Sequence, residues 1–258
     1  RPDGTGCAMS RQANNWLVVG ASGSGKTHYI QQLVTALEGR YRHLVVVSPD
    51  NTLADRCRHH EEVGLDRLQQ KYDPAKIAEL VRHYRAVHFE ITPGPTEAFL
   101  DVLGQACMLL GQKGATDCRV LLVVLEARNY LAKNTVGASS GMGRVEAEGR
   151  RYGVDVIKET QRLQSTGADA LDKVATYYAT RVVVCPISDL RTRERVQEEW
   201  PLPDPGELAR PDVGKGWGGE YFVYDVLTGN GARIRRDPAG ARYTEPLGGG
   251  TETRSLQG

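Results

Sequence analysis

The sequence predicts an α/β protein with a mostly parallel central sheet and helices on both of its faces. Short, nearly continuous apolar runs alternate with segments of helical spacing as far as Cys185. Strands that are buried on both faces have this pattern, and their alternation with helices indicates parallel strands joined by helical crossovers. A glycine-rich turn, residues 20–27, directly follows the first apolar run and precedes the first helical segment.

The individual elements follow from these patterns. Strands are expected at residues 16–20, 43–48, 86–91, 119–125, 154–157 and 178–185. Helices are expected at residues 27–38, 75–84, 96–110, 144–152 and 168–177. The charged, His-containing segment 50–73 is expected to be helical and peripheral, and the small, glycine-rich segment 134–143 to be a mobile loop.

A small β-hairpin extension is predicted near the C-terminus. Residues 221–226 and 232–236 flank Thr228-Gly229-Asn230-Gly231, a turn sequence between two apolar runs. From Asp237 onward Pro, Gly and Thr dominate, which predicts a loosely ordered tail. We therefore expect a core in residues 1–200 and a C-terminal extension in residues 201–258.

Composition excludes several classes of protein. With 258 residues, 40% hydrophobic and 25% charged, the chain has the composition of a soluble globular protein with one large core. Its net charge of +1 provides no overall basic field, so a DNA-binding surface would be local or built from several subunits. The five scattered cysteines lack C-x-x-C spacing, which argues against a disulfide framework or zinc site. We find neither a signal peptide nor an apolar run of about 20 residues that could span a bilayer.

The glycine-rich turn matches the phosphate-loop pattern G-x-x-x-x-G-K-[ST] and lies between a strand and a helix, as that motif requires. Its glycines let backbone N–H groups point inward around phosphate oxygens. Lys26 would contact the β- and γ-phosphates, and the Thr27 hydroxyl would be a ligand of Mg²⁺. The alternative, an ordinary glycine-rich turn, fits this context less well. The expected nucleotide-binding residues are Gly20, Ala21, Ser22, Gly23, Ser24, Gly25, Lys26, Thr27 and His28.

Two further strand ends carry side chains suited to hydrolysis. Glu126 follows the apolar run 121–125, where a carboxylate could take a proton from the attacking water. Leu125 occupies the position at which an aspartate usually supports Mg²⁺. Gln161 ends another strand, where its amide could bind the attacking water or the γ-phosphate. Alternatively, Glu126 could be an acidic residue at a helix N-terminus and Gln161 a polar residue at the protein surface.

These motifs together resemble those of the FtsK/HerA superfamily of DNA-pumping ATPases. The resemblance lies in residues 20–27, in LLVVLEARNY at 121–130 and in GRRYGVDVIKETQRLQ at 149–164, and extends over residues 14–190. Within the superfamily, the genome-packaging ATPases of membrane-containing icosahedral viruses and phages are most similar. The resemblance implies a RecA-like core, a ring that is commonly a hexamer, and ATP-driven translocation of double-stranded DNA.

The resemblance also implies roles for single residues. Lys26 and Thr27 match the phosphate and Mg²⁺ ligands, Glu126 the catalytic glutamate and Gln161 the sensor at a strand end. Arg150 and Arg151 lie where a neighbouring subunit would donate an arginine, although a solvated helix end is equally consistent with them. The implied cofactors are ATP and Mg²⁺. The implied partners are double-stranded DNA, further copies of the chain and viral capsid or membrane vertex proteins, in the host cytoplasm.

Two segments with small or basic residues are candidates for DNA contact. Residues 134–144 and the cluster Arg191, Arg193 and Arg195 could follow a phosphate backbone without reading bases. The cluster lies beside Glu194, Glu198 and Glu199, however, as the charges of an exposed salt-bridged helix would.

Three interpretations of the function stay open, two of which depend on the leucine at position 125. Glu126, helped by a nearby acid such as Asp50, could compensate for the missing aspartate, in which case Leu125→Asp would raise a slow turnover. Alternatively, the chain is a nucleotide-binding scaffold or assembly protein with impaired hydrolysis. It could also be a cellular DNA-pumping ATPase of the same superfamily, since fold alone does not set function.

Overall fold

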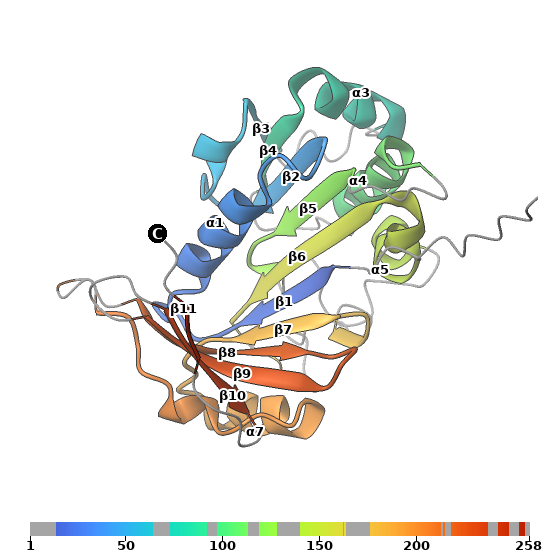
Figure 1. Cartoon of the computed structure of the whole chain (residues 1–258). Helices are drawn as coiled ribbons and strands as arrows, with labels where there is room; N and C mark the ends of the chain where they lie inside the picture. The colour runs from blue at the N-terminus through green and yellow to red at the C-terminus, as the bar shows by residue number, and fades with distance from the viewer. Residues whose placement is uncertain are drawn as a thin grey trace, which may run out of the picture.

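The structure is a computed structural model that describes residues 14–63, 73–91, 97–112, 119–127, 140–161, 163, 176–212, 214, 218–236, 242–247 and 253–255. Its strands form one sheet of eleven, in the order β11-β10-β9-β8-β7-β1-β6-β5-β2-β4-β3 (Figure 1). Strands β3, β4, β2, β5, β6, β1 and β7 are parallel, and β8 to β11 continue the sheet in antiparallel fashion. The predicted α/β class with a mostly parallel sheet is confirmed.

The strands have the following bounds: β1 Asn15–Val19, β2 His43–Ser48, β3 His59–Val63, β4 Ala86–Ile91, β5 Val120–Val124, β6 Val154–Thr160, β7 Arg181–Val184, β8 Gly219–Asp225, β9 Asn230–Arg236, β10 Arg242–Leu247 and β11 Thr253–Ser255. The helices are α1 Lys26–Leu37, α3 Pro74–Tyr84, α4 Glu97–Leu110, α5 Gly141–Tyr152 and α7 Leu190–Glu199. None of these helices is long and apolar enough to cross a membrane.

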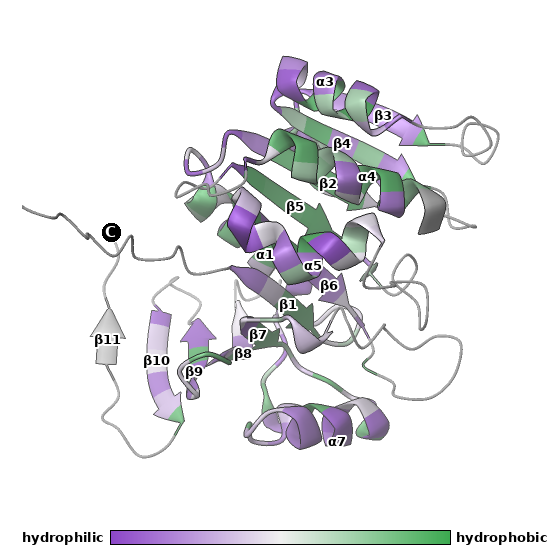
Figure 2. Cartoon of the chain, turned by 90° about the vertical axis from the view of Figure 1, so that its right-hand side faces the viewer, coloured by the Kyte–Doolittle hydropathy of each residue, from purple (hydrophilic) through white to green (hydrophobic). Residues whose placement is uncertain are grey.

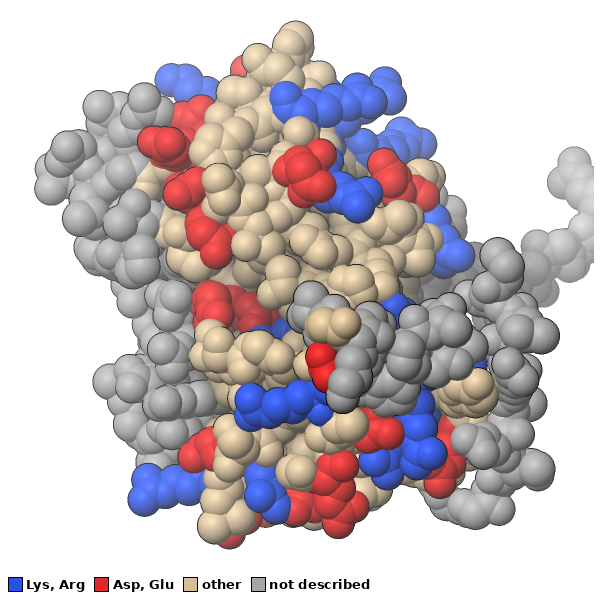
Figure 3. Space-filling model, turned by 90° about the vertical axis from the view of Figure 1, so that its left-hand side faces the viewer, with Lys and Arg blue, Asp and Glu red and all other residues tan. Residues whose placement is uncertain are grey.

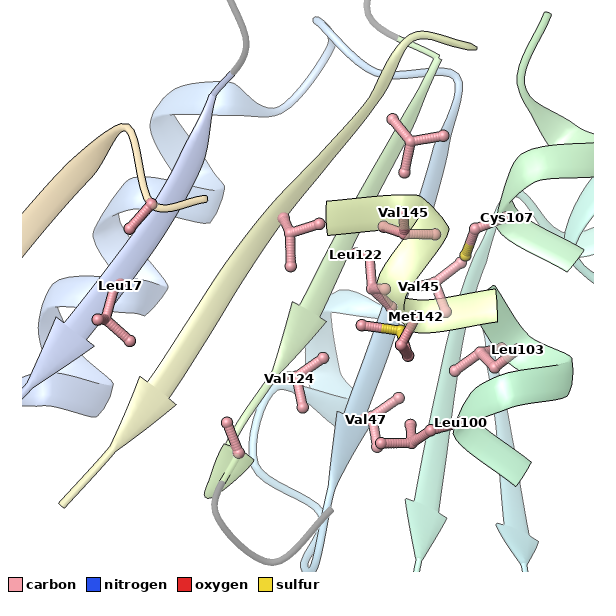
Figure 4. Packing of buried hydrophobic residues seen from close by; sticks show 14 of the residues in the cluster. Leu17, Val45, Val47, Leu100, Leu103, Cys107, Leu122, Val124, Met142 and Val145 are labelled. Atoms are coloured by element: carbon pink, nitrogen blue, oxygen red, sulfur yellow. The ribbon is translucent and has the colours of Figure 1, made fainter. Parts of the chain in front are cut away.

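Alternation along the buried strands divides the core into two layers. Val45 and Val47 of β2 contribute to a cluster that includes apolar residues of α3, α4 and α5, whereas Val46 between them contributes to a cluster with α1. Figure 4 shows Met142 and Val145 of α5 packing over the first of these layers. Figure 2 shows the contrast between the apolar strand β5 and the hydrophilic helix α7 at the periphery. Helices thus cover both faces of the sheet, because central strands such as β2 and β5 are apolar on both sides.

All six predicted strands are confirmed, and so is the hairpin, which consists of β8 and β9. The hairpin is paired to the core, because β8 forms an antiparallel ladder with β7. The described residues of the predicted tail form β10 and β11, so the expectation of a loosely ordered tail was wrong for these segments. Antiparallel pairing of β10 with β9 and of β11 with β10 supplies order that their Pro- and Gly-rich composition does not predict.

Two other expectations also need correction. Part of segment 50–73, predicted to be helical, is the edge strand β3, in which half-buried and exposed residues alternate. The predicted mobile loop 134–143 in fact includes the start of helix α5 at Gly141, which the Ser140 side chain caps by accepting from the Gly143 N–H at 3.0 Å. Residues 134–139 lie outside the described part of the chain, as does most of the helix predicted at 168–177.

The glycine at the start of α5 has a packing role that a stability measurement can test. A Cβ atom at position 141 would lie 1.9 Å from the backbone oxygen of Asp101 in α4. Because backbone must move to relieve this contact, we expect Gly141→Ala to destabilise the fold by about 1–3 kcal/mol in denaturant unfolding. Arg144→Ala, at an exposed position of the same helix, is the control and should change stability by less than about 0.5 kcal/mol. Equal stability of the two variants would show that α4 and α5 are not packed this closely.

Candidate nucleotide-binding site

The predicted phosphate loop lies between β1 and α1, at the carboxyl end of the parallel strands. Its root is fixed by two backbone hydrogen bonds, from the Gly20 N–H to the Thr160 oxygen at 3.3 Å and from the Ala21 N–H to the Pro186 oxygen at 3.0 Å. Gly23 and Gly25 have φ angles of 69° and 90°, a left-handed conformation that favours glycine. The loop therefore curls between two neighbouring strands before the helix begins.

Unsatisfied hydrogen-bonding groups gather in this loop. Helix α1 begins at Lys26 without a side-chain cap, so the N–H groups of its first three residues have no acceptor within the helix. The buried Ser24 hydroxyl also has no hydrogen-bond partner in the described part of the chain. Such donors at a helix N-terminus suit phosphate oxygens. Thr27 and His28 are exposed on the first turn of α1, where the His28 ring lies 2.7 Å from Gln32 Nε2. Residues 20–28 thus fit the triphosphate that the motif predicts.

The Lys26 side chain is held over the loop by two contacts. Its Nζ atom donates to the Ala21 backbone oxygen at 2.9 Å and lies 3.1 Å from Glu159 Oε1. Both partners of this ion pair are buried, with side-chain exposures of 6% for Lys26 and 5% for Glu159. A buried charge pair of this kind persists only when each charge has its partner. Lys26 is therefore positioned by a carboxylate from another strand.

That carboxylate, Glu159, was not among the residues to which the sequence analysis assigned a role. It lies near the end of β6, the strand between β1 and β5, and is paired in register with Val18. Its second oxygen, Oε2, accepts the Glu126 backbone N–H at 2.9 Å. Burial raises the pKa of Glu159 above its usual value, and the nearby Lys26 ammonium offsets part of this rise. Glu159 links the phosphate loop to the predicted catalytic glutamate.

Glu126 and Gln161 lie side by side at the ends of β5 and β6. Gln161 Nε2 donates to Glu126 Oε1 at 2.5 Å. The φ angle of Glu126 is 49°, which is unusual for a residue with a side chain and costs about 1–3 kcal/mol. The hydrogen bond to Glu159 holds the backbone in this conformation. The structure thus brings together Lys26, Glu126 and Gln161, as predicted, and adds Glu159 to them.

Solved structures of two viral NTPases are similar to this chain. The genome-packaging NTPase B204 of Sulfolobus turreted icosahedral virus 2, in complex with ATP-γS, superposes with a TM-score of 0.61 and 13% identity, covering 87% of this chain and 98% of B204. B204 of Sulfolobus turreted icosahedral virus, a DNA-packaging ATPase, gives 0.59 and 14%, covering 87% and 97%. The chain has the fold of B204, a P-loop NTPase. No protein-family model matches the sequence, and no curated protein is significantly similar to it.

Within this P-loop NTPase fold, Leu125 belongs to the apolar core. It is 4% exposed and packs in the cluster that includes Ile30 and Val34 of α1. The register Val124↔Lys158 places Leu125 beside Glu159. Glu159 is two residues beyond Ile157, which packs in the same cluster, so alternation puts its side chain on the α1 face as well. The carboxylate that is missing at position 125 is therefore present on the neighbouring strand and on the same face.

Asp50, suggested above as the compensating acid, is placed differently. It is exposed after the end of β2, and its Oδ1 atom accepts the Thr52 N–H at 2.9 Å. The acid that contacts Lys26 is Glu159, and a compensating role of Asp50 stays a prediction. The sequence carries a signal for Glu159: an acidic residue two positions after Ile157, near the end of a predicted central strand.

Arg150 and Arg151 lie away from the site within one chain. They are exposed in the last turn of α5, just before β6 begins, whereas Glu159 is near the other end of β6. The seven residues of β6 separate the two ends by roughly 20 Å. A role as an arginine donated to a neighbouring copy stays a prediction.

The charged cluster on α7 has the arrangement of an exposed salt-bridged helix. Arg193 Nε donates to Asp204 Oδ1 at 2.6 Å, and Arg195 pairs with Glu198 at 3.0 Å and with Glu199. These partners neutralise two of the three arginines proposed for DNA contact. Of the other candidate segment, 134–144, only residues from Ser140 onward are described.

Proposed function

We propose that this chain is an ATP-driven translocase of double-stranded DNA that packages a viral genome into a preformed capsid. The observation that carries the proposal is the arrangement of Lys26, Glu159, Glu126 and Gln161 around a phosphate loop. The fold supports it, because B204, which has the same fold, is a genome-packaging NTPase. We further propose a ring of identical subunits, commonly a hexamer in the family that the motifs resemble, acting in the host cytoplasm at the capsid vertex.

The site residues have distinct parts in ATP hydrolysis. Backbone N–H groups of the loop and Lys26 hold the phosphates. Thr27 and Glu159 are the residues that would hold Mg²⁺, which neutralises phosphate charge when bound. Glu126 accepts a proton from the attacking water as the new O–P bond forms and the bond from the γ-phosphorus to the ADP oxygen breaks. Gln161, which is hydrogen-bonded to Glu126, orients that water and would contact the γ-phosphate when ATP is bound.

The alternative of a nucleotide-binding scaffold with impaired hydrolysis rests on Leu125. Glu159 weakens it, because a buried carboxylate on the same face lies beside the position of the missing aspartate. A cellular DNA-pumping ATPase would have the same site, so the geometry favours neither cellular nor viral origin. The viral role is proposed from the similarity to B204.

Translocation can be measured directly. We expect the chain, with ATP and Mg²⁺, to displace a triplex-forming oligonucleotide from a linear duplex. Lys26→Ala is the control and should abolish displacement. If the chain hydrolyses ATP and binds the duplex but leaves the triplex intact, it is an ATPase without translocase activity.

The geometry changes the expected effect of restoring the aspartate. Leu125→Asp would place a second carboxylate beside Glu159 and remove a buried apolar side chain from the core. We therefore expect no gain in ATP turnover from this variant alone, contrary to the expectation from sequence. A severalfold increase in kcat over the unmodified chain would show that metal support by Glu159 is insufficient.

A further inference from the structure

Charge is unevenly distributed on the surface despite the net charge of +1. In the upper half of the face in Figure 3, Lys and Arg side chains lie mainly along the right border and acidic side chains mainly along the left one. Separately, the structure contains an open cavity of about 810 Å³ at the amino ends of β2 and β4, beside the C-terminal end of α1. It lies at the opposite end of α1 from Lys26, and the twelve residues of the helix separate the two by roughly 18 Å.

Five arginines line this cavity, which we call the arginine pocket: Arg42, Arg56, Arg58, Arg82 and Arg85. Glu38 is the one carboxylate among its described lining residues. Arg56 has a partner in Asp55 at 3.5 Å, whereas no carboxylate pairs with the side chains of Arg58 and Arg85 in the described part of the chain. Arg58 and Arg85 therefore contribute positive charge that the described lining residues of the pocket do not neutralise.

The arginines also affect the pKa of His43, which lines the same cavity. Partial burial lowers the pKa of His43, a hydrogen bond with the Val81 backbone raises it, and the neighbouring Arg82, Arg42 and Arg85 lower it further. Its Nδ1 atom is buried without a hydrogen-bond partner in the described part of the chain. Arginines that line one cavity repel each other, and a bound anion relieves this repulsion; one of them, Arg82, also donates from Nη2 to the Leu109 backbone oxygen at 3.2 Å.

Apolar and aromatic side chains also line the arginine pocket. Val34, Leu37, Leu44 and Leu121 line it, together with Tyr41, whose hydroxyl donates to Asp155 Oδ2 at 2.6 Å. That hydrogen bond fixes the ring, so the cavity has an apolar and aromatic lining in addition to its arginines. A ligand that fits both parts needs a flat or apolar group and a phosphate group, and the volume is that of a site for a small molecule.

We propose that the arginine pocket binds a nucleoside phosphate at a site distinct from the phosphate loop. Its base would contact the apolar lining residues beside Tyr41. Its phosphate would be held by the arginines, whose planar donor groups match phosphate oxygens. The ligand could be a free nucleotide or a nucleotide of a single strand, since both have this chemistry. The inference does not depend on hydrolysis or translocation.

The test uses the full chain carrying Lys26→Ala, in which the phosphate loop is disabled. AMP and a short oligo(dT) are titrated separately by calorimetry. We expect one of them to saturate a single site, and Arg58→Gln combined with Arg82→Gln to weaken that binding at least tenfold. Arg40→Gln, an exposed arginine outside the pocket, is the matched control and should leave the affinity unchanged.

The outcomes distinguish the sources of the ligand. Binding of AMP alone identifies a free nucleotide, and binding of oligo(dT) alone identifies a nucleic acid strand. The proposal is overturned if neither binds, if the two pocket substitutions have no effect, or if poly-glutamate competes as well as the nucleotide does. Thermal unfolding of each variant shows whether the fold is retained, and failure here leaves the function of the phosphate loop untouched.

Discussion

Glu159→Gln is expected to lower kcat for ATP hydrolysis by roughly 100-fold or more, a loss typical for a group that supports transition-state charge. Glu159 pairs with Lys26 at 3.1 Å and accepts the Glu126 backbone N–H at 2.9 Å. Removing its charge leaves the buried Lys26 ammonium without a charged partner and removes the acid beside Leu125 from the site. The Mg²⁺ concentration for half-maximal ATPase rate should also rise, which separates loss of metal support from a purely structural effect.

A double variant makes this prediction specific. Leu125→Asp supplies a carboxylate on the adjacent strand and the same face, so in the Glu159→Gln background it should restore part of both kcat and Mg²⁺ affinity. Glu62→Gln, at an exposed position of the edge strand β3, is the matched control. A Glu159→Gln protein that folds and retains its turnover and Mg²⁺ dependence would refute the role of Glu159.

Glu126→Gln is expected to reduce kcat by about 10²–10⁴-fold while leaving ATP binding intact. The amide keeps the size of the side chain and its contact with Gln161, but it cannot accept a proton from water. Single-turnover hydrolysis measures the chemical step, and titration with a fluorescent ATP analogue measures binding. Unchanged single-turnover hydrolysis would place the general base elsewhere.

Local sequence patterns predicted most of the fold. The strands at residues 43–48 and 86–91 have the predicted bounds, because apolar residues concentrated between polar turns leave little choice of boundary. The segment that contains β3 was predicted wrongly, because an exposed edge strand rich in His and Glu has no apolar run to identify it. Its strand conformation arises from pairing with β4.

The candidate site shows the same division between local and long-range information. The phosphate loop and Glu126 could be predicted because each follows its own strand directly. The contact between Glu159 and Lys26 could not, because it depends on the order of strands in the sheet, which places β6 between β1 and β5. Leu125 therefore indicated a missing acid, whereas the folded site has one.

We propose that this chain is an active, DNA-linked ATPase despite the leucine at position 125. The most direct test is the steady-state rate of Mg²⁺-dependent ATP hydrolysis by the unmodified chain, with and without linear double-stranded DNA. We predict measurable hydrolysis that DNA accelerates. Tight ATP binding with no turnover, in the presence or absence of DNA, would contradict the claim and favour a nucleotide-binding scaffold.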